Sequence, residues 1–243
     1  MFYTAVTLSF LASYFYFLLF KKEKHKFTPE LDTLSSSFML NRISKEWWMW
    51  MTAPVENYFV RKKVAPSTIT YASLFFSAIA CVGFSFGDFV WAGWAIVFAG
   101  TCDLLDGRIA RRIGRQTKWG DFLDSTIDRW CEILWYLGLF NFYANTLFFY
   151  VVFIALITSF MISYVKARGE SLHVSSKMGI MQRSERIVWL GVSSVLSPLF
   201  SATTHYFAPV STTFLASVGI SVIAIVNSYT YYERSLHISK QLK

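Results

Sequence analysis

The chain has 243 residues, of which 54% are hydrophobic and 19% aromatic, and its formal net charge is +8. This much apolar surface exceeds what the core of a soluble domain needs, so the composition excludes an ordinary soluble protein and indicates a membrane protein. The positive charge does not indicate nucleic-acid binding, because the Lys and Arg residues gather at the ends of apolar stretches, where they can meet anionic lipid headgroups.

The N-terminal part of the chain contains two segments of different character. Residues 2–20 are apolar and are followed by a charged run that begins at Lys21. A signal peptide has its positive charge before the apolar run, so this order predicts a retained membrane helix within residues 1–24. The next segment, residues 25–65, holds Trp residues between positions 47 and 50 beside basic side chains. This mixture predicts an amphipathic helix in the headgroup region, with a buried helix of soluble type as the alternative.

Six further apolar stretches are long enough to cross a bilayer and make up the catalytic region that we expect over residues 66–243. They lie near 68–86, 89–112, 120–142, 147–166, 186–205 and 212–232. Lys and Arg occupy alternate connections, so six spans with both ends in the cytoplasm satisfy the positive-inside rule at every loop. The sequence thus predicts an all-α, multi-pass integral membrane protein: a six-helix bundle with an extra N-terminal membrane helix and an interfacial amphipathic helix.

Four acidic residues flank the connection between the second and third of these spans. Asp103 and Asp106 are spaced i, i+3, and Asp124 and Asp128 are spaced i, i+4, so each pair projects from one face of its helix. Carboxylates that converge near hydrocarbon repel one another unless cations neutralise them. Oxygen ligands without nearby His or Cys suit Mg²⁺, Mn²⁺ or Ca²⁺, and four carboxylates are enough for the two ions often used in phosphoryl chemistry. Ordinary interfacial polarity is the alternative interpretation.

Small residues accompany these acids. Gly107 and Ala110 lie on a face adjacent to the first acid pair, and Gly120 opens the next helix. Their lack of bulk would let a flat nucleotide approach the backbone, although small residues in membrane helices also serve helix packing. Arg111, one turn after Gly107, can pair with a donor phosphate through its planar guanidinium.

A second polar string lies between the fourth and fifth spans. Its cations are Lys166, Arg168, Arg183 and Arg186. Four cations on one side of the membrane could bind a phosphate group of a substrate. From the residues alone, however, the positive-inside rule explains them better.

The string from Asp103 to Asp128 resembles the signature of the CDP-alcohol phosphotransferase family, D-x-x-D-G-x-x-A-R-(x8)-G-x-x-x-D-x-x-x-D, and matches all of its specified residues. The six-span layout and the Ala-Pro pair before the first span are also similar to the family. Ser67 departs from it, since many relatives carry Asn after this Pro. The resemblance implies transfer of a phosphatidyl-type group from a CDP-lipid, such as CDP-diacylglycerol, to an alcohol, with release of CMP.

The resemblance also implies roles for the matching residues. Two divalent cations, Mg²⁺ or Mn²⁺, would be held by Asp103, Asp106, Asp124 and Asp128. Asp128 would in addition be the general base for the acceptor hydroxyl. The cytidine diphosphate pocket would be lined by Gly107, Ala110, Arg111 and Gly120. A homodimer with its active site at the cytoplasmic face of the membrane is expected.

Within the family, the second polar string resembles the branch that makes phosphatidylinositol phosphate or archaetidylinositol phosphate. Inositol phosphate is therefore the expected acceptor, with its phosphate bound by Lys166, Arg168, Arg183 and Arg186. Glycerol 3-phosphate, free inositol and serine stay open as acceptors. A small ion transporter is the non-enzymatic alternative, but the motif acids all lie at one end of two adjacent helices, whereas a conduction path needs polar groups across the midplane.

Overall fold

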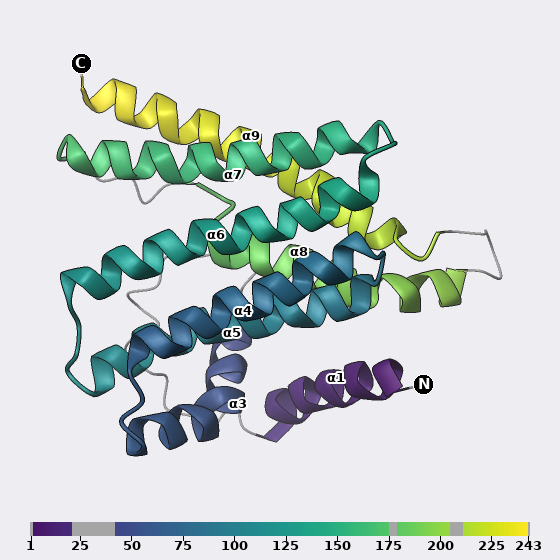
Figure 1. Ribbon diagram of the computed structural model, residues 1–243, viewed down its shortest axis with the longest axis horizontal. Helices are drawn as coiled ribbons and strands as arrows, with labels where there is room; N and C mark the ends of the chain where they lie inside the picture. Colours follow the sequence, from purple (N-terminus) through teal and green to yellow (C-terminus); the bar gives the residue numbers. More distant parts are fainter. Residues whose placement is uncertain (1, 21–41, 175–178, 205–210, 243) are drawn as a thin grey trace. The chain divides into compact units, whose positions relative to one another are not determined.

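The computed structural model describes residues 2–20, 42–174, 179–204 and 211–242, and the regular structure in these ranges is entirely α-helical (Figure 1). The chain forms two compact units, Met1–Val64 and Ala65–Lys243. The prediction of an all-α protein is confirmed for the described residues. Residues 21–41, which include part of the predicted interfacial segment, lie outside the described residues.

The first unit consists of α1 (Phe2–Phe20) and α3 (Arg42–Arg61). Aromatic side chains hold these two helices together. The Trp47 ring lies edge-on against Phe10 and Tyr14, with centroids 4.8 and 5.0 Å apart. The Tyr14 hydroxyl also lies 3.4 Å from Ser44 Oγ. The indole of Trp47 thus packs within this helix pair, and the placement of α3 in a headgroup region stays a prediction.

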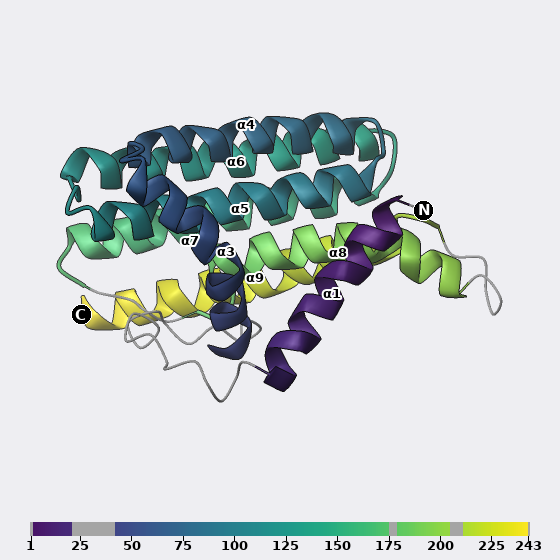
Figure 2. The ribbon, with the colours of Figure 1, turned by 90° about the horizontal axis from the view of Figure 1, so that it is seen from below.

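The second unit contains six long helices that run side by side (Figure 1, Figure 2). They are α4 (Pro66–Ser85), α5 (Phe89–Arg112), α6 (Lys118–Tyr143), α7 (Phe148–Ser171), α8 (Arg183–Thr204) and α9 (Phe214–Gln241). Each coincides with one predicted apolar stretch. Packed neighbours follow the order α4, α5, α8, α9, α7 and α6, which returns to α4, so the helices form a closed ring.

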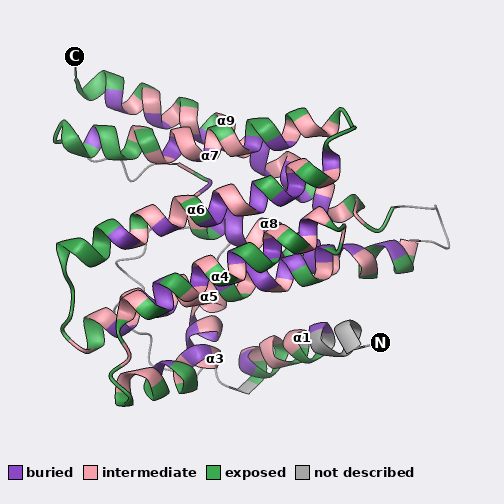
Figure 3. Ribbon diagram, viewed as in Figure 1, coloured by how far each residue is buried: buried purple, intermediate pink, exposed green. Residues whose placement is uncertain are grey.

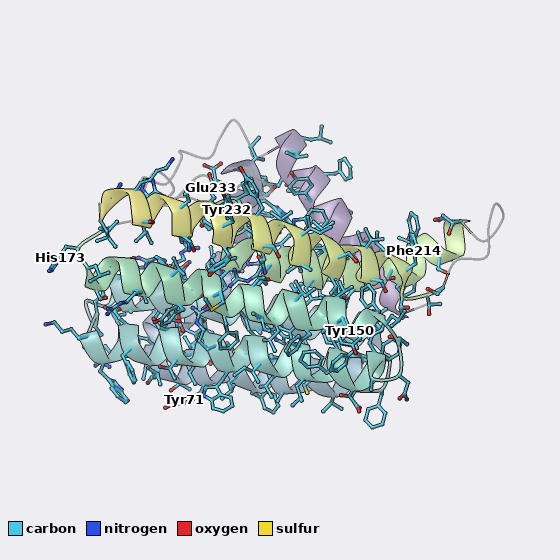
Figure 4. All side chains as sticks on the ribbon, turned by 90° about the horizontal axis from the view of Figure 1, so that it is seen from above. Tyr71, Tyr150, His173, Phe214, Tyr232 and Glu233 are labelled. Carbon is cyan, nitrogen blue, oxygen red and sulfur yellow. The ribbon has the colours of Figure 1, made fainter. Side chains whose placement is uncertain are left out.

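The interior of this ring is closely packed and mainly apolar, with buried polar side chains such as Ser77 and Asn227 among the apolar ones. Ala92 and Ile96 of α5 and Ile220 of α9 are among the fully buried side chains. Large aromatic side chains such as Tyr71, Tyr150 and Tyr232 are exposed and point away from the bundle (Figure 4). Figure 3 shows buried and exposed positions interspersed along the helices of the second unit. An exterior rich in exposed aromatic and apolar side chains suits a lipid environment, in which these side chains need no polar partner.

Five of the described helices, α4, α5, α7, α8 and α9, are long and apolar enough to cross a membrane. This is what a multi-pass membrane protein requires. The 26-residue helix α6 is long enough but too highly charged to be counted among them. Its charged residues include Asp124, Asp128, Arg129 and Glu132. The helix that lowers the count therefore carries two of the four predicted metal ligands, Asp124 and Asp128.

The connection between α5 and α6 is short and brings the two predicted acid pairs to the same end of the unit. Gly114 adopts a left-handed conformation, with φ of +66°, which a glycine tolerates without strain. Thr117 then caps α6 by accepting a hydrogen bond from the Gly120 N–H at 3.0 Å. Because the turn is short, α5 and α6 run antiparallel, and α4 packs against both of them.

Candidate active site

Three carboxylates meet where α5 ends and α6 begins. Asp103 from α5 and Asp124 and Asp128 from α6 each offer an oxygen atom, and these atoms lie within 4.8 Å of one another. The three side chains are partly buried. Close carboxylates with little solvent around them repel one another, so the arrangement favours a bound cation. The donor set consists of hard oxygen ligands, which Mg²⁺ and Mn²⁺ prefer.

A buried polar atom gives independent support for a cation at this point. Asp124 Oδ1 is buried and finds no hydrogen-bond donor within the described ranges. A buried carboxylate oxygen without a partner costs free energy, and a divalent ion would satisfy it. The residues present therefore fit the metal site that the motif predicts.

Asp106, the fourth predicted ligand, turns toward a different helix. It is buried, and its Oδ2 accepts a hydrogen bond from Thr70 Oγ1 of α4 at 2.6 Å. It does not belong to the group of three converging carboxylates, although it lies within electrostatic range of Asp103 and Asp124. Thr70 was not singled out from the sequence, since nothing in a stretch 36 residues away marks it as a partner of Asp106.

Arg183 bridges two of the three carboxylates. Its Nη1 lies 2.7 Å from Asp103 Oδ2, and its Nη2 lies 2.7 Å from Asp128 Oδ1. The guanidinium fork thus supplies positive charge to the acid cluster from the first residue of α8. The sequence selected Arg183 as a phosphate ligand, and the structure places its guanidinium directly at the predicted metal site.

Arg186, one turn after Arg183, lies in a second ion pair. Its Nε and Nη2 both donate to Glu132 Oε1, at 3.1 and 2.6 Å. Both side chains are almost completely buried, with exposures of 4% for Arg186 and 1% for Glu132. Glu132 was not predicted as a functional residue, because it occupies no motif position. Arg186 was expected to contact a substrate phosphate, but in this structure its donors are directed to a carboxylate inside the bundle.

The two remaining predicted cations lie on the last turns of α7. Lys166 and Arg168 are both exposed. Lys166 forms a loose ion pair with Glu170 at 3.9 Å. Another cation, Arg234 of α9, is buried and donates to the Ile162 carbonyl of α7 at 3.1 Å. Arg234 was not predicted, because nothing in the sequence distinguishes it from the other basic residues near the C-terminal end.

The glycines of the motif differ from those that pack helices together. A Cβ on Gly107 would meet only Arg111 Nη1, at an ordinary 3.4 Å. A Cβ on Gly138 would overlap the Cys81 carbonyl oxygen, and one on Gly93 would lie 2.8 Å from the Gly191 carbonyl oxygen. Helix packing therefore explains Gly138 and Gly93 but not Gly107. The exposed Arg111 side chain passes beside the open face of Gly107.

The surroundings of Gly120 differ from those of Gly107. It is exposed at the start of α6, and a Cβ there would lie 3.2 Å from the Thr117 hydroxyl that caps the helix. Ala110 is partly buried near the end of α5. Gly107 and Gly120 therefore leave the backbone open one helical turn from Asp103 and Asp124.

Comparison with known proteins points to the family whose signature this chain resembles. A family model described as CDP-alcohol phosphatidyltransferase matches residues 63–226. The chain is 29% identical over 212 residues to a phosphatidylinositol phosphate synthase of Streptomyces avermitilis, covering 84% of each chain. It is 29% identical over 175 residues to an archaetidylinositol phosphate synthase of Methanothermobacter thermautotrophicus, covering 72% of this chain and 83% of the relative.

The fold is similar to crystal structures of the phosphatidylinositol phosphate synthase PgsA1 of Mycobacterium tuberculosis. The structure with CDP-DAG bound has a TM-score of 0.65 at 24% identity and covers 77% of this chain and 92% of that one. A structure in complex with manganese and citrate has the same TM-score and identity. The apo form has a TM-score of 0.63 at 27% identity and covers 76% of this chain and 94% of that one. The residues matched by the family model, 63–226, include all the motif residues.

Proposed function

The chain belongs to the CDP-alcohol phosphatidyltransferase family, and we propose that it transfers a phosphatidyl-type group from a CDP-lipid to an inositol phosphate, with release of CMP. The relatives named as phosphatidylinositol phosphate and archaetidylinositol phosphate synthases support this acceptor. The CDP-DAG bound to the related mycobacterial synthase supports this donor. The same chemistry with glycerol 3-phosphate, free inositol or serine is the alternative.

The convergence of Asp103, Asp124 and Asp128 beside Arg183 carries this proposal. Two Mg²⁺ or Mn²⁺ ions bound by these carboxylates, with Asp106 close by, would supply positive charge to the donor diphosphate and to the departing CMP. Asp128 accepts the proton of the acceptor hydroxyl as that oxygen attacks the lipid-linked phosphorus. The bond from this phosphorus to the CMP oxygen breaks, and the negative charge stays on CMP.

The acceptor pocket follows from the position of Arg183. A phosphate bound by its guanidinium lies next to Asp128, because Arg183 already contacts that carboxylate at 2.7 Å. The exposed Lys166 and Arg168 at the end of α7 are further phosphate ligands in this proposal. Binding of the acceptor phosphate would therefore bring a hydroxyl of the same molecule to the base.

The nucleotide pocket gives a paired prediction. Gly107→Ala should leave the fold intact, since its Cβ has room, but should raise the donor KM by about tenfold, the effect of losing about 1.4 kcal/mol of binding. Gly138→Ala should lower the unfolding temperature without selectively changing the donor KM, because overpacking costs about 1–3 kcal/mol. Thermal unfolding and donor titrations in detergent measure both. An unchanged donor KM in Gly107→Ala would show that the face of α5 at Gly107 does not line the nucleotide pocket.

The membrane arrangement is a further part of the proposal. We infer that α4 to α9 all cross the bilayer and that the site faces the cytoplasm. In the second unit, basic residues at 108–118, 166–168, 183–186 and 234–240 support this orientation, because they lie at the same ends of the helices as the acids. A homodimer, expected from the family resemblance, belongs to the same proposal.

The reaction is tested by measuring CMP release from CDP-diacylglycerol by the purified protein with Mg²⁺ or Mn²⁺. We expect turnover with inositol 1-phosphate and far less with inositol, glycerol 3-phosphate or serine. Turnover with only one of the other alcohols would support the proposed reaction but assign a different acceptor. Absence of CMP release with every acceptor, in protein that still binds Mn²⁺, would overturn the proposed function.

A further inference from the structure

The chain enters α8 through a short segment that is held against α9. Residues 179–182 lead directly into Arg183, the first residue of α8. Within this segment, the Met181 N–H donates to Thr230 Oγ1 of α9 at 3.2 Å. Thr230 is 0% exposed and Met181 is 2% exposed, so this hydrogen bond lies in the interior of the second unit. A buried backbone N–H needs a partner, and here a side chain 49 residues away supplies it.

A glycine lets the segment come close to α9. Gly179 has a φ of +122°, a conformation that L side chains rarely adopt. A Cβ on Gly179 would also lie 2.6 Å from Thr230 Cγ2, so the backbone or the threonine would have to shift. The Gly179 backbone therefore lies against the methyl group of Thr230, while the hydroxyl of the same side chain binds Met181. Thr230 contacts the segment at two points.

The path of this segment determines where the Arg183 guanidinium can reach. Met181 precedes Arg183 by two residues, and its side chain is part of the apolar core. The Arg183 guanidinium lies 2.7 Å from both Asp103 and Asp128. A misplacement of about 1 Å at such a site can cost about 100-fold in rate. A shift of the backbone ahead of α8 would therefore move the group that binds the acceptor phosphate in the proposed reaction.

Stability alone is the simpler explanation of one buried hydrogen bond, and the chain contains a matched example. The Ala216 N–H of α9 donates to Ser197 Oγ of α8 at 3.3 Å, and Ser197 is 0% exposed. This hydrogen bond also joins a backbone N–H to a buried hydroxyl, but it lies at the end of α8 far from Arg183. The two positions separate a general effect on stability from an effect on the site.

We propose that Thr230 is a positioning residue, which holds residues 179–182 against α9 and so places Arg183 to bind the phosphate of the acceptor. This inference rests on the proposed function. Thr230 acts through the path of the chain into α8. The nucleotide pocket and the metal ligands are built from α5 and α6, so donor binding does not depend on Thr230.

The test compares Thr230→Val with the matched control Ser197→Ala. Each variant removes a buried hydroxyl that accepts one backbone N–H, so both should lose some thermal stability. Thr230→Val should in addition raise the acceptor KM by about 3–10-fold, the effect of losing one hydrogen bond, and leave the donor KM unchanged. An unchanged acceptor KM, an equal rise of the donor KM, or the same rise of the acceptor KM in Ser197→Ala would overturn the proposal.

Two further variants keep the test decisive if Thr230→Val fails to fold. Thr230→Ser keeps the hydroxyl and should keep the acceptor KM of the wild type. Gly179→Ala acts from the other side of the contact, because its Cβ would push the segment away from Thr230. Its acceptor KM should rise while its donor KM stays unchanged. A wild-type acceptor KM in Gly179→Ala, or a raised one in Thr230→Ser, would contradict the proposal.

Hydrogen exchange separates this inference from the proposed function. Without substrates, the Met181 amide should exchange faster in Thr230→Val than in the wild type and at the wild-type rate in Ser197→Ala, because only the first variant removes its acceptor. If the wild type releases no CMP with any acceptor, the proposed function fails, while this exchange rate still decides whether Thr230 holds the segment. Exchange at the wild-type rate in Thr230→Val would overturn the inference.

Discussion

Replacing Asp128 by asparagine should abolish CMP release while the protein stays folded. Asparagine has the same shape as aspartate but cannot accept the proton of the acceptor hydroxyl, and loss of a general base lowers kcat by about 10²–10⁴-fold. Asp103 still pairs with Arg183 at 2.7 Å, so the guanidinium does not become an unpaired buried charge. Asp103 and Asp124 still offer carboxylates to a metal ion, and binding of the CDP donor should largely survive.

This expectation is checked by CMP release and by donor binding on the same preparation. Asp121→Asn is the matched control, because Asp121 lies on the same helix, is exposed and is outside the motif. Its turnover should equal that of the wild type. Wild-type turnover in Asp128→Asn would refute the assignment of Asp128 as the base. Loss of both turnover and donor binding would indicate that Asp128 acts as a metal ligand and not as the base.

The helices α4 to α9 were predictable because each coincides with a long apolar stretch of the sequence. The two largest differences are at helix ends: α7 continues to Ser171 and α9 to Gln241, beyond the predicted ends at 166 and 232. These last turns are polar, and a hydropathy pattern marks where a helix leaves hydrocarbon, not where its hydrogen bonds end. The count of six spans is not reproduced by composition, because α6 carries two carboxylates of the site together with Arg129 and Glu132.

The site was predictable only as far as local spacing determines it. Asp103, Asp124 and Asp128 converge because a short turn joins two helices whose acid pairs each share a face. The partners that cross between distant helices were not predictable. Thr70 is 36 residues from Asp106, and Arg186 is 54 residues from Glu132. One sequence carries no signal of such pairings, since a buried Glu or Thr in an apolar stretch has no distinctive spacing.

The second large effect is expected from Arg183→Ala, which should weaken binding of the acceptor and strengthen binding of Mn²⁺. The acceptor KM should rise by about 10–100-fold, because a charge-assisted hydrogen bond to a phosphate contributes about 1.5–3 kcal/mol. Mn²⁺ affinity should rise as well, because Arg183 contacts the same Asp103 and Asp128 carboxylates that a metal ion needs. Removing this guanidinium removes a competing cation from the cluster.

The two effects are separated by measuring acceptor KM in turnover and Mn²⁺ affinity without substrate. Arg115→Ala is the matched control, since it removes an exposed cation from the connection between α5 and α6 and should change neither quantity. An unchanged acceptor KM would mean that Arg183 does not bind the acceptor phosphate and that the positive-inside rule explains its presence. Weaker Mn²⁺ binding would show that Arg183 orients the carboxylates, because the loss of a mere competitor raises affinity and the loss of a supporting contact lowers it.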